Sequence, residues 1–236
     1  MKLDYIYHSG FAIEADGVTV IIDYYKDSSE EVFNKGIVHD YLLEKPGVLY
    51  VLCSHFHPDH FNREVLSWKK LRPDIRYIFS KDILKHRRAS AEDATYINKG
   101  DTYEDEHIRI QAFGSTDVGI SFLIDLQGRR LFHAGDLNNW HWSEESTPQE
   151  IRKAEGDFLA GSERAAANCT CRRCSHVSGG QPYRKRLYAW SRTIRGTNKN
   201  HYICTDALQR RLSGRQRLPA VCREQGMPLS EHCTPW

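Results

Sequence analysis

The sequence predicts a layered α/β protein. Over residues 1–160, short apolar segments of strand length alternate with amphipathic segments, and the connections between them are short. The segment 47–54, GVLYVLCS, is a continuous apolar run, as expected of a buried strand. Such an alternation is typical of a sheet covered by helices.

The elements can be placed in chain order. An Ala-Asp-Gly turn at 15–17 separates the first two strands. Strands are expected at 3–7, 18–23, 47–54, 75–80, 107–113, 118–125 and 129–136.

Capping residues predict where the helices begin. Ser28 and Ser29 precede a helical segment at 30–45, and Asn62 precedes another at 62–71. A short helix is expected near 81–87. A last one starts at Thr147, where Thr-Pro-Gln-Glu has the spacing of a capping box with proline in the first turn.

Length and composition fit one globular core, or a core with a small appendage. The chain has 236 residues and a mean hydropathy of −0.61. It has no apolar run of about 18 residues, so we expect no membrane-spanning helix and no membrane partner. Its first residues lack the apolar stretch of a signal peptide, so we expect a cytoplasmic protein. Composition does not indicate an oligomeric state.

The net charge of +2 hides two different compositions. Residues 1–160 carry 19 Lys and Arg against 27 Asp and Glu, whereas residues 161–236 carry 14 against 4. All nine phenylalanines lie in the first part, which has Cys53 as its one cysteine. The second part holds the other six: Cys169, Cys171, Cys174, Cys204, Cys222 and Cys233. We therefore predict a core at 1–160 and a different, basic segment at 161–236.

The stretch His55-Phe-His57-Pro-Asp59-His60 directly follows the predicted buried strand. His55 and His57 alternate along an extended segment, so both can reach one metal ion, and Asp59 and His60 suit a second ion nearby. Imidazole and carboxylate ligands fit zinc first, with manganese or iron as alternatives. The competing interpretation is a polar surface loop in which Asp59 caps the next helix.

This motif resembles the signature of the metallo-β-lactamase-fold hydrolases, and the resemblance covers about residues 3–160. It implies an αββα sandwich that binds one or two divalent metal ions, with a C-terminal part that is incomplete or non-native in this chain. Gly135-Asp136 fits the family's bridging carboxylate, and Asp23 would end a strand near the site. His8 and the segment HAGD resemble the branch with ascorbate-6-phosphate lactonase-like proteins.

The resemblance also implies a chemistry. A metal-bound hydroxide would hydrolyse a small ester, lactone or phosphate-containing substrate, because paired cations lower the pKa of a bound water. Asp59 would additionally orient the nucleophile. His141, with Trp140 and Trp142, could line the substrate cleft, although packing is the more ordinary role for both tryptophans.

The family's third histidine ligand has no counterpart here. The loop where it is expected reads AFGSTDVG, so Ser115 or Asp117 occupies its place. Asp117 could substitute for it, or it could simply be a turn residue. His133 is expected to point into the fold.

Residues 161–236 allow three interpretations. Cys171-x-x-Cys174 is a plausible half-site and, followed by His201 and Cys204, could belong to a zinc module. The basic excess could instead bind nucleic acid, although we do not expect that partner because the basic residues form no recognisable face. The third interpretation is a tail that is translated out of frame and poorly ordered.

The out-of-frame hypothesis can be tested with the genetic code. Dropping one base near Gly161 permits TTIFVPMHF from about residue 200, a strand ending in the histidine that should close the site. Without that histidine, we expect impaired hydrolysis. Two alternatives stay open: an inactive metal- or nucleic-acid-binding module, and a protein with one metal held by His55, His57 and one acid.

Overall fold

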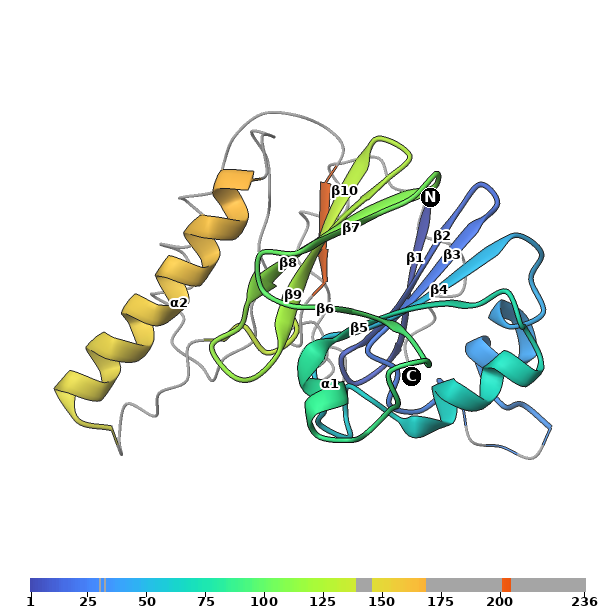
Figure 1. The fold of residues 1–236 in the computed structure, drawn as a ribbon, viewed down its shortest axis with the longest axis horizontal. Coiled ribbons are helices and arrows are strands. Elements are labelled where there is room, and N and C mark those ends of the chain that lie inside the picture. Colours follow the sequence, from blue (N-terminus) through green and yellow to red (C-terminus); the bar gives the residue numbers. More distant parts are fainter. Residues whose placement is uncertain (30, 32, 139–145, 169–200, 205–236) are drawn as a thin grey trace.

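The computed structural model describes residues 1–29, 31, 33–138, 146–168 and 201–204. Within these ranges two β-sheets face each other, and helices lie on the outer side of each sheet (Figure 1). This arrangement confirms the predicted αββα sandwich. None of the helices in these ranges has the length and apolar character that crossing a bilayer requires.

The first sheet runs in chain order from β1 to β6. Its strands are β1 (Lys2–Tyr7), β2 (Gly10–Ala15), β3 (Val18–Ile22), β4 (Val48–Cys53), β5 (Arg76–Ser80) and β6 (Thr95–Ile97). The first three pair antiparallel, whereas β3 to β6 pair parallel. Because β3 and β4 run in the same direction, the residues that follow them lie at the same edge of the sheet.

The second sheet has the order β11-β10-β9-β8-β7. Its strands are β7 (Thr102–Glu104), β8 (Ile108–Gly114), β9 (Ile120–Leu126), β10 (Arg129–His133) and β11 (His201–Cys204). The strands β7 to β10 pair antiparallel, and β11 pairs parallel to β10. The strands β2, β6, β7 and β11 have no counterpart among the predicted strands.

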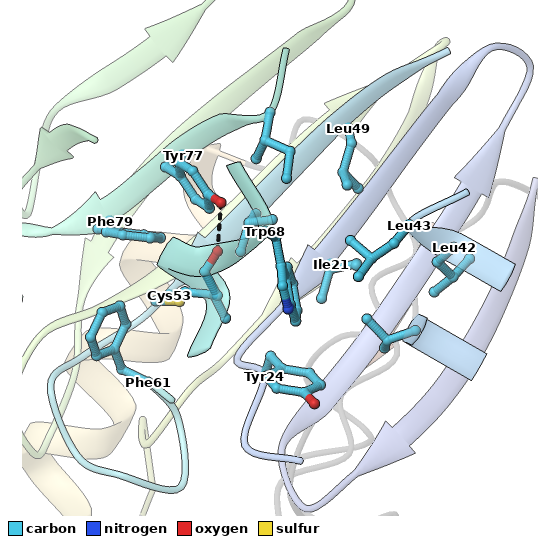
Figure 2. Packing of buried hydrophobic residues seen from close by; sticks show 14 of the residues in the cluster. Ile21, Tyr24, Leu42, Leu43, Leu49, Cys53, Phe61, Trp68, Tyr77 and Phe79 are labelled. Carbon is cyan, nitrogen blue, oxygen red and sulfur yellow. Dashed lines mark hydrogen bonds between the residues drawn. The ribbon is translucent and has the colours of Figure 1, made fainter. Parts of the chain in front are cut away.

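Two apolar layers hold the sandwich together. Alternate residues of β4 point into different layers: Tyr50 and Leu52 pack between the sheets, and Val51 and Cys53 pack beneath the helices. The second layer includes Trp68, whose ring centroid lies 4.8 Å from that of Tyr24 (Figure 2). The predicted strand at 47–54 is uniformly apolar because both of its faces are covered.

The helices are η1 (Val38–Leu42, a π-helical turn), η2 (Arg63–Lys70, a 3₁₀-helix), α1 (Lys81–Lys85) and α2 (Pro148–Asn168). The caps predicted at Asn62 and Thr147 are confirmed. The Asn62 side chain accepts a hydrogen bond from the backbone N–H of Glu64 at 2.9 Å. The backbone N–H of Thr147 donates to Glu150 at 2.8 Å, as in a capping box. The helix α2 continues past residue 160. The predicted boundary between a core at 1–160 and a basic segment at 161–236 stays a prediction.

The helix predicted at 30–45 is wrong. Among its described residues, the helical element is confined to η1. The reason is a contact from outside the segment: the Asp27 carboxylate accepts the backbone N–H groups of Val38 at 3.0 Å and His39 at 2.9 Å, and so starts the helix late. Gly36, at φ +104°, makes room, because a Cβ there would lie 2.3 Å from Asp27 Oδ1.

Candidate metal centre

Strand ends from both sheets meet at one edge of the sandwich. The segment after β4 carries the His-x-His-x-Asp-His motif, and the turn between β1 and β2 carries His8. From the second sheet, the loop before β9 carries Asp117, and the segment after β10 carries Asp136. Side chains at such strand ends are held by a rigid scaffold and still face a common opening.

The first candidate group consists of His55, His57, Asp117 and Asp136. One ligand-type atom of each lies within 4.8 Å of the others. Nε2 of His55 is 3.0 Å from Nδ1 of His57 and 3.6 Å from Oδ2 of Asp136. Nδ1 of His57 is 3.5 Å from Oδ2 of Asp117. Two imidazole nitrogens and two carboxylate oxygens are a suitable set for zinc, manganese or iron.

The second candidate group consists of His8, Asp59 and His60, again with atoms within 4.8 Å of one another. Oδ2 of Asp59 is 3.7 Å from Nε2 of His8 and 3.8 Å from Nε2 of His60. Asp136 lies between the two groups: its Oδ1 is 3.2 Å from Nε2 of His60, and its Oδ2 faces His55. A carboxylate with one oxygen toward each group is placed to bridge two cations.

A buried carboxylate supports both groups from below. Asp23 is fully buried and accepts hydrogen bonds from the backbone N–H and the hydroxyl of Ser54, both at 2.7 Å. Nδ1 of His60 lies 2.9 Å from Oδ2 of Asp23, and Nε2 of His133 lies 2.7 Å from it. Burial raises the pKa of Asp23, but His133 and His60 lower it far more, so the group is a carboxylate. When Nδ1 of His60 donates to this carboxylate, its Nε2 is turned toward Asp136, where it can carry a proton or, once that proton leaves, bind a metal ion.

The electrostatics of the edge fit a cation. Nε2 of His60 is buried and lies 3.2 Å from Oδ1 of Asp136 without the geometry of a hydrogen bond. Burial lowers the pKa of His60, but Asp136 and Asp23 raise it to about 11, so this position holds positive charge. A metal ion could replace that proton. Burial and the charge of His60 lower the pKa of His55, which keeps this imidazole neutral, as a metal ligand must be.

Backbone contacts fix the positions of these side chains. Gly119 has φ +76°, and a Cβ there would lie 2.2 Å from the Ser54 carbonyl oxygen and 2.5 Å from His55 Cβ. The absence of a side chain therefore lets the start of β9 approach His55. From the other side, the Asp82 carboxylate accepts the backbone N–H of Phe56 at 2.9 Å, which holds the peptide between the motif's first two histidines.

A cavity of about 510 Å³ lies between β8 and α2. Its lining includes Ser115 and Thr116, which directly precede Asp117, but none of the seven residues of the two candidate groups. It is thus a neighbour of the candidate centre and not the centre itself.

The structure brings together all five residues predicted as metal ligands: His55, His57, Asp59, His60 and Asp136. Their binding of metal, and the catalytic role of Asp59, stay predictions. The side chain of His133 is buried in the fold, as expected. His141, together with Trp140 and Trp142, lies outside the described residues, as do Cys171 and Cys174.

Two further residues join the site. Asp117 lies in the first candidate group, where the sequence left a choice between a ligand and a turn residue. His8 lies in the second. In the sequence, His8 was singled out only by the resemblance, and nothing indicated which residues it would contact.

The chain is similar to known proteins in sequence and in structure. The profile of the β-lactamase superfamily domain matches residues 2–152. No curated protein sequence matches the chain. Among solved structures, the metallo hydrolase Igni18 from the archaeon Ignicoccus hospitalis is 22% identical, with a TM-score of 0.39, over 56% of this chain and 60% of that one. The MIM-2 metallo-β-lactamase is 18% identical, with a TM-score of 0.44, over 92% and 78%.

A second kind of enzyme shares the architecture. CmlA, a diiron β-hydroxylase from Streptomyces venezuelae, is 17% identical, with a TM-score of 0.49, over 84% of this chain and 40% of CmlA. A CmlA mutant gives a TM-score of 0.50 at 16% identity. The chain spans less than two thirds of Igni18 and of CmlA, and these likenesses concern the fold alone. Because the superfamily profile covers well over half of the sequence, the chain belongs to the β-lactamase superfamily.

Proposed function

We propose that this chain is a metal-dependent hydrolase with a two-cation centre at the edge of the sandwich. The observation that carries the proposal is the position of Asp136, whose two carboxylate oxygens face His60 and His55 separately. His55 and His57, with Asp117, would hold one cation, and His60 and Asp59 the other. The donor set favours zinc, with manganese or iron as alternatives.

Each residue has a separate task in this proposal. The cations, when bound, would supply a nucleophile at neutral pH and polarise the substrate's carbonyl or phosphoryl oxygen. Asp59, whose side chain is 40% exposed, can accept a proton at a carboxylate oxygen and orient the attacking water. Asp23 holds His60 in the tautomer that presents Nε2 to the cation.

The proposed substrate is a small ester, lactone or phosphate compound. His8 and the segment HAGD, which resemble the ascorbate-6-phosphate lactonase-like branch, support this class. A nucleic-acid-binding module is not favoured, because the basic residues that suggested it, in 161–236, form no recognisable cluster in the sequence. A cytoplasmic location is part of the same proposal.

Metal content and hydrolysis together test the proposal. The full-length chain, loaded with zinc, manganese or iron in turn, is analysed for bound metal and assayed with p-nitrophenyl acetate, bis(p-nitrophenyl) phosphate and a lactone series. We expect two cations per chain. We also expect at least a 100-fold loss of kcat/KM for His57→Ala, because this substitution removes one of the two imidazole ligands of the first candidate group.

His107→Ala is the matched control, since His107 lies between β7 and β8, away from the candidate groups. It should leave both measurements unchanged. One cation per chain would favour the single-metal alternative, and a chain without bound metal or hydrolysis would refute the proposal. The kcat/KM of the wild-type chain for these substrates tests whether its hydrolysis is impaired, as the missing closing histidine led us to expect.

A further inference from the structure

We propose that His8 is the third protein ligand of the second cation, together with Asp59 and His60. This inference rests on the proposed function and adds to it. The resemblance led us to expect the closing histidine after a late strand, in the segment 161–236. The structure assigns the position instead to the turn between β1 and β2, at the opposite end of the sequence.

The orientation of the His8 ring supports the assignment. Its Nε2 is 3.7 Å from Oδ2 of Asp59, and its ring stands nearly perpendicular to that of His60, with centroids 6.0 Å apart. Its Nδ1 lies 3.1 Å from the hydroxyl oxygen of Ser9, which is itself buried. When Nδ1 donates to Ser9, the lone pair of Nε2 is directed at the second group.

The backbone at His8 gives an independent argument. His8 has φ +53°, in the left-handed region that favours glycine. It lies in a two-residue connection, since Tyr7 pairs with Gly10 across the hairpin. Glycine would relieve the strain, so the turn alone does not require an imidazole. Strained backbone of this kind gathers at functional sites, where the side chain has a task.

The neighbouring atoms point to a cation. Nε2 of His60 is buried, lies 3.2 Å from Oδ1 of Asp136 without the geometry of a hydrogen bond, and faces the same space as Nε2 of His8. Two imidazole nitrogens and one carboxylate oxygen are a common protein ligand set for a catalytic zinc ion, which keeps a further position for water or substrate. The side chains of His8 and Asp59 are 28% and 40% exposed, so that position opens to solvent.

With His8, all seven residues of the two groups fall between positions 8 and 136. The second cation then requires no histidine from residues 161–236. Loss of the closing histidine would therefore not by itself empty the second position.

Zinc titration of the full-length chain tests the assignment. We compare the wild type with His8→Gly by competition with a chromophoric chelator, and record the visible spectrum with cobalt in place of zinc. We expect His8→Gly to lose at least about 10-fold in affinity for one of the two ions and to change the cobalt spectrum. Its melting temperature without metal should equal or exceed that of the wild type, because glycine relieves the strain.

Arg87→Gly is the matched control. Arg87 also has a positive φ, +56°, and is exposed after α1, outside both candidate groups. It should keep both zinc ions at wild-type affinity. His8→Asp, which restores an oxygen ligand, should recover part of the lost affinity.

The outcomes separate the two proposals. If His8→Gly binds zinc with the same stoichiometry and affinities as the wild type, His8 is a turn residue and the assignment is wrong, while the proposed hydrolase centre stands. If the wild type itself binds no zinc, manganese or iron, the proposed function fails.

Discussion

Replacing Asp23 by asparagine tests whether one buried carboxylate supports both the fold and the metal centre. Oδ1 of Asp23 accepts the Ser54 backbone N–H, and Oδ2 faces three groups: the Ser54 hydroxyl, Nδ1 of His60 and Nε2 of His133. The side chain has no exposed surface. Asparagine has the same shape, but it has one acceptor oxygen and no charge.

The expected loss of stability is large. In either orientation of the amide, its NH₂ group faces at least one N–H donor, which leaves buried polar groups unpaired. Removing one partner of a buried charged pair costs about 3–5 kcal/mol, and water does not screen the loss at this depth. That amount is a large share of the roughly 5–15 kcal/mol that stabilises a typical domain. We expect Asp23→Asn to lose about 3 kcal/mol or more in urea unfolding at pH 7.

The same substitution should weaken metal binding. Without the carboxylate, His60 is no longer held in the tautomer that presents Nε2, and such a loss typically lowers metal affinity about 10- to 100-fold. Asp105→Asn is the control, because Asp105 accepts the hydroxyl of Tyr103 and a guanidinium N–H of Arg76, both at 2.7 Å, in the turn before β8. It should lower stability and leave zinc affinity unchanged. An Asp23→Asn protein within about 1 kcal/mol of the wild type, with wild-type zinc affinity, would refute this reasoning.

Three further predictions concern backbone, metal and pH. Gly119→Ala should destabilise the chain by more than about 2 kcal/mol in urea unfolding, because the added Cβ meets Ser54 and the backbone has φ +76°; unchanged stability would mean that β9 can move away from His55. Zinc at about 100 times its Kd should stabilise the chain by about 2.7 kcal/mol, and EDTA should reverse the rise in melting temperature; no shift would argue against a metal centre. Burial raises the pKa of Glu14, but Lys45 and its other hydrogen-bond partners lower it to about 2 from 4.5. Its contribution is therefore present above pH 4.5 and lost as the pH falls through about 2. The Glu14 carboxylate contributes about 1–2 kcal/mol to the free energy of unfolding, after allowance for screening of the partly exposed lysine. Glu14→Gln should therefore lower that free energy by the same amount at pH 7 and by less at pH 2.

Local patterns were enough to predict most of the sandwich. The apolar run at 47–54 identified β4 because a strand covered on both faces has no polar positions. The helix at 30–45 failed because its start depends on Asp27, whose carboxylate contacts the backbone of Val38, 11 residues away. No rule based on neighbouring residues includes such a contact. Ser28, which suggested a cap, instead stabilises the loop: its hydroxyl accepts the backbone N–H of Ile37 at 2.9 Å.

The candidate centre likewise combines a local motif, which the sequence reveals, with contacts between distant residues, which it does not. The motif from His55 to His60 is local, so its spacing alone suggested two cations. Asp117 and His8 reach it from other elements, and their positions depend on how the second sheet and the β1–β2 hairpin are placed. From the sequence, Asp117 was at least as well explained as a turn residue as it was as a metal ligand. The distance of 3.5 Å from its Oδ2 to Nδ1 of His57 favours the ligand role.

The out-of-frame hypothesis for residues 161–236 leads to a last prediction. The structure places β11, His201–Cys204, beside β10, with Tyr202 opposite Leu131 and Ile203 opposite Phe132. Both β10 residues are buried, and a strand in that position is expected to be apolar. In the shifted frame, the codons for residues 201–204 permit Thr-Ile-Phe-Val, which suits a buried strand better than His-Tyr-Ile-Cys.

Sequencing the gene across the codons for residues 155–165 tests the hypothesis directly. We expect a single-base insertion or deletion relative to close relatives. The protein with the frame restored should be more stable in urea and more soluble, because an apolar strand would replace a polar one at the edge of β10. Close relatives that encode the same basic, cysteine-rich segment would contradict the hypothesis. In that case β11 would belong to the native fold, and the placement of His8 would explain how the centre is closed without a later histidine.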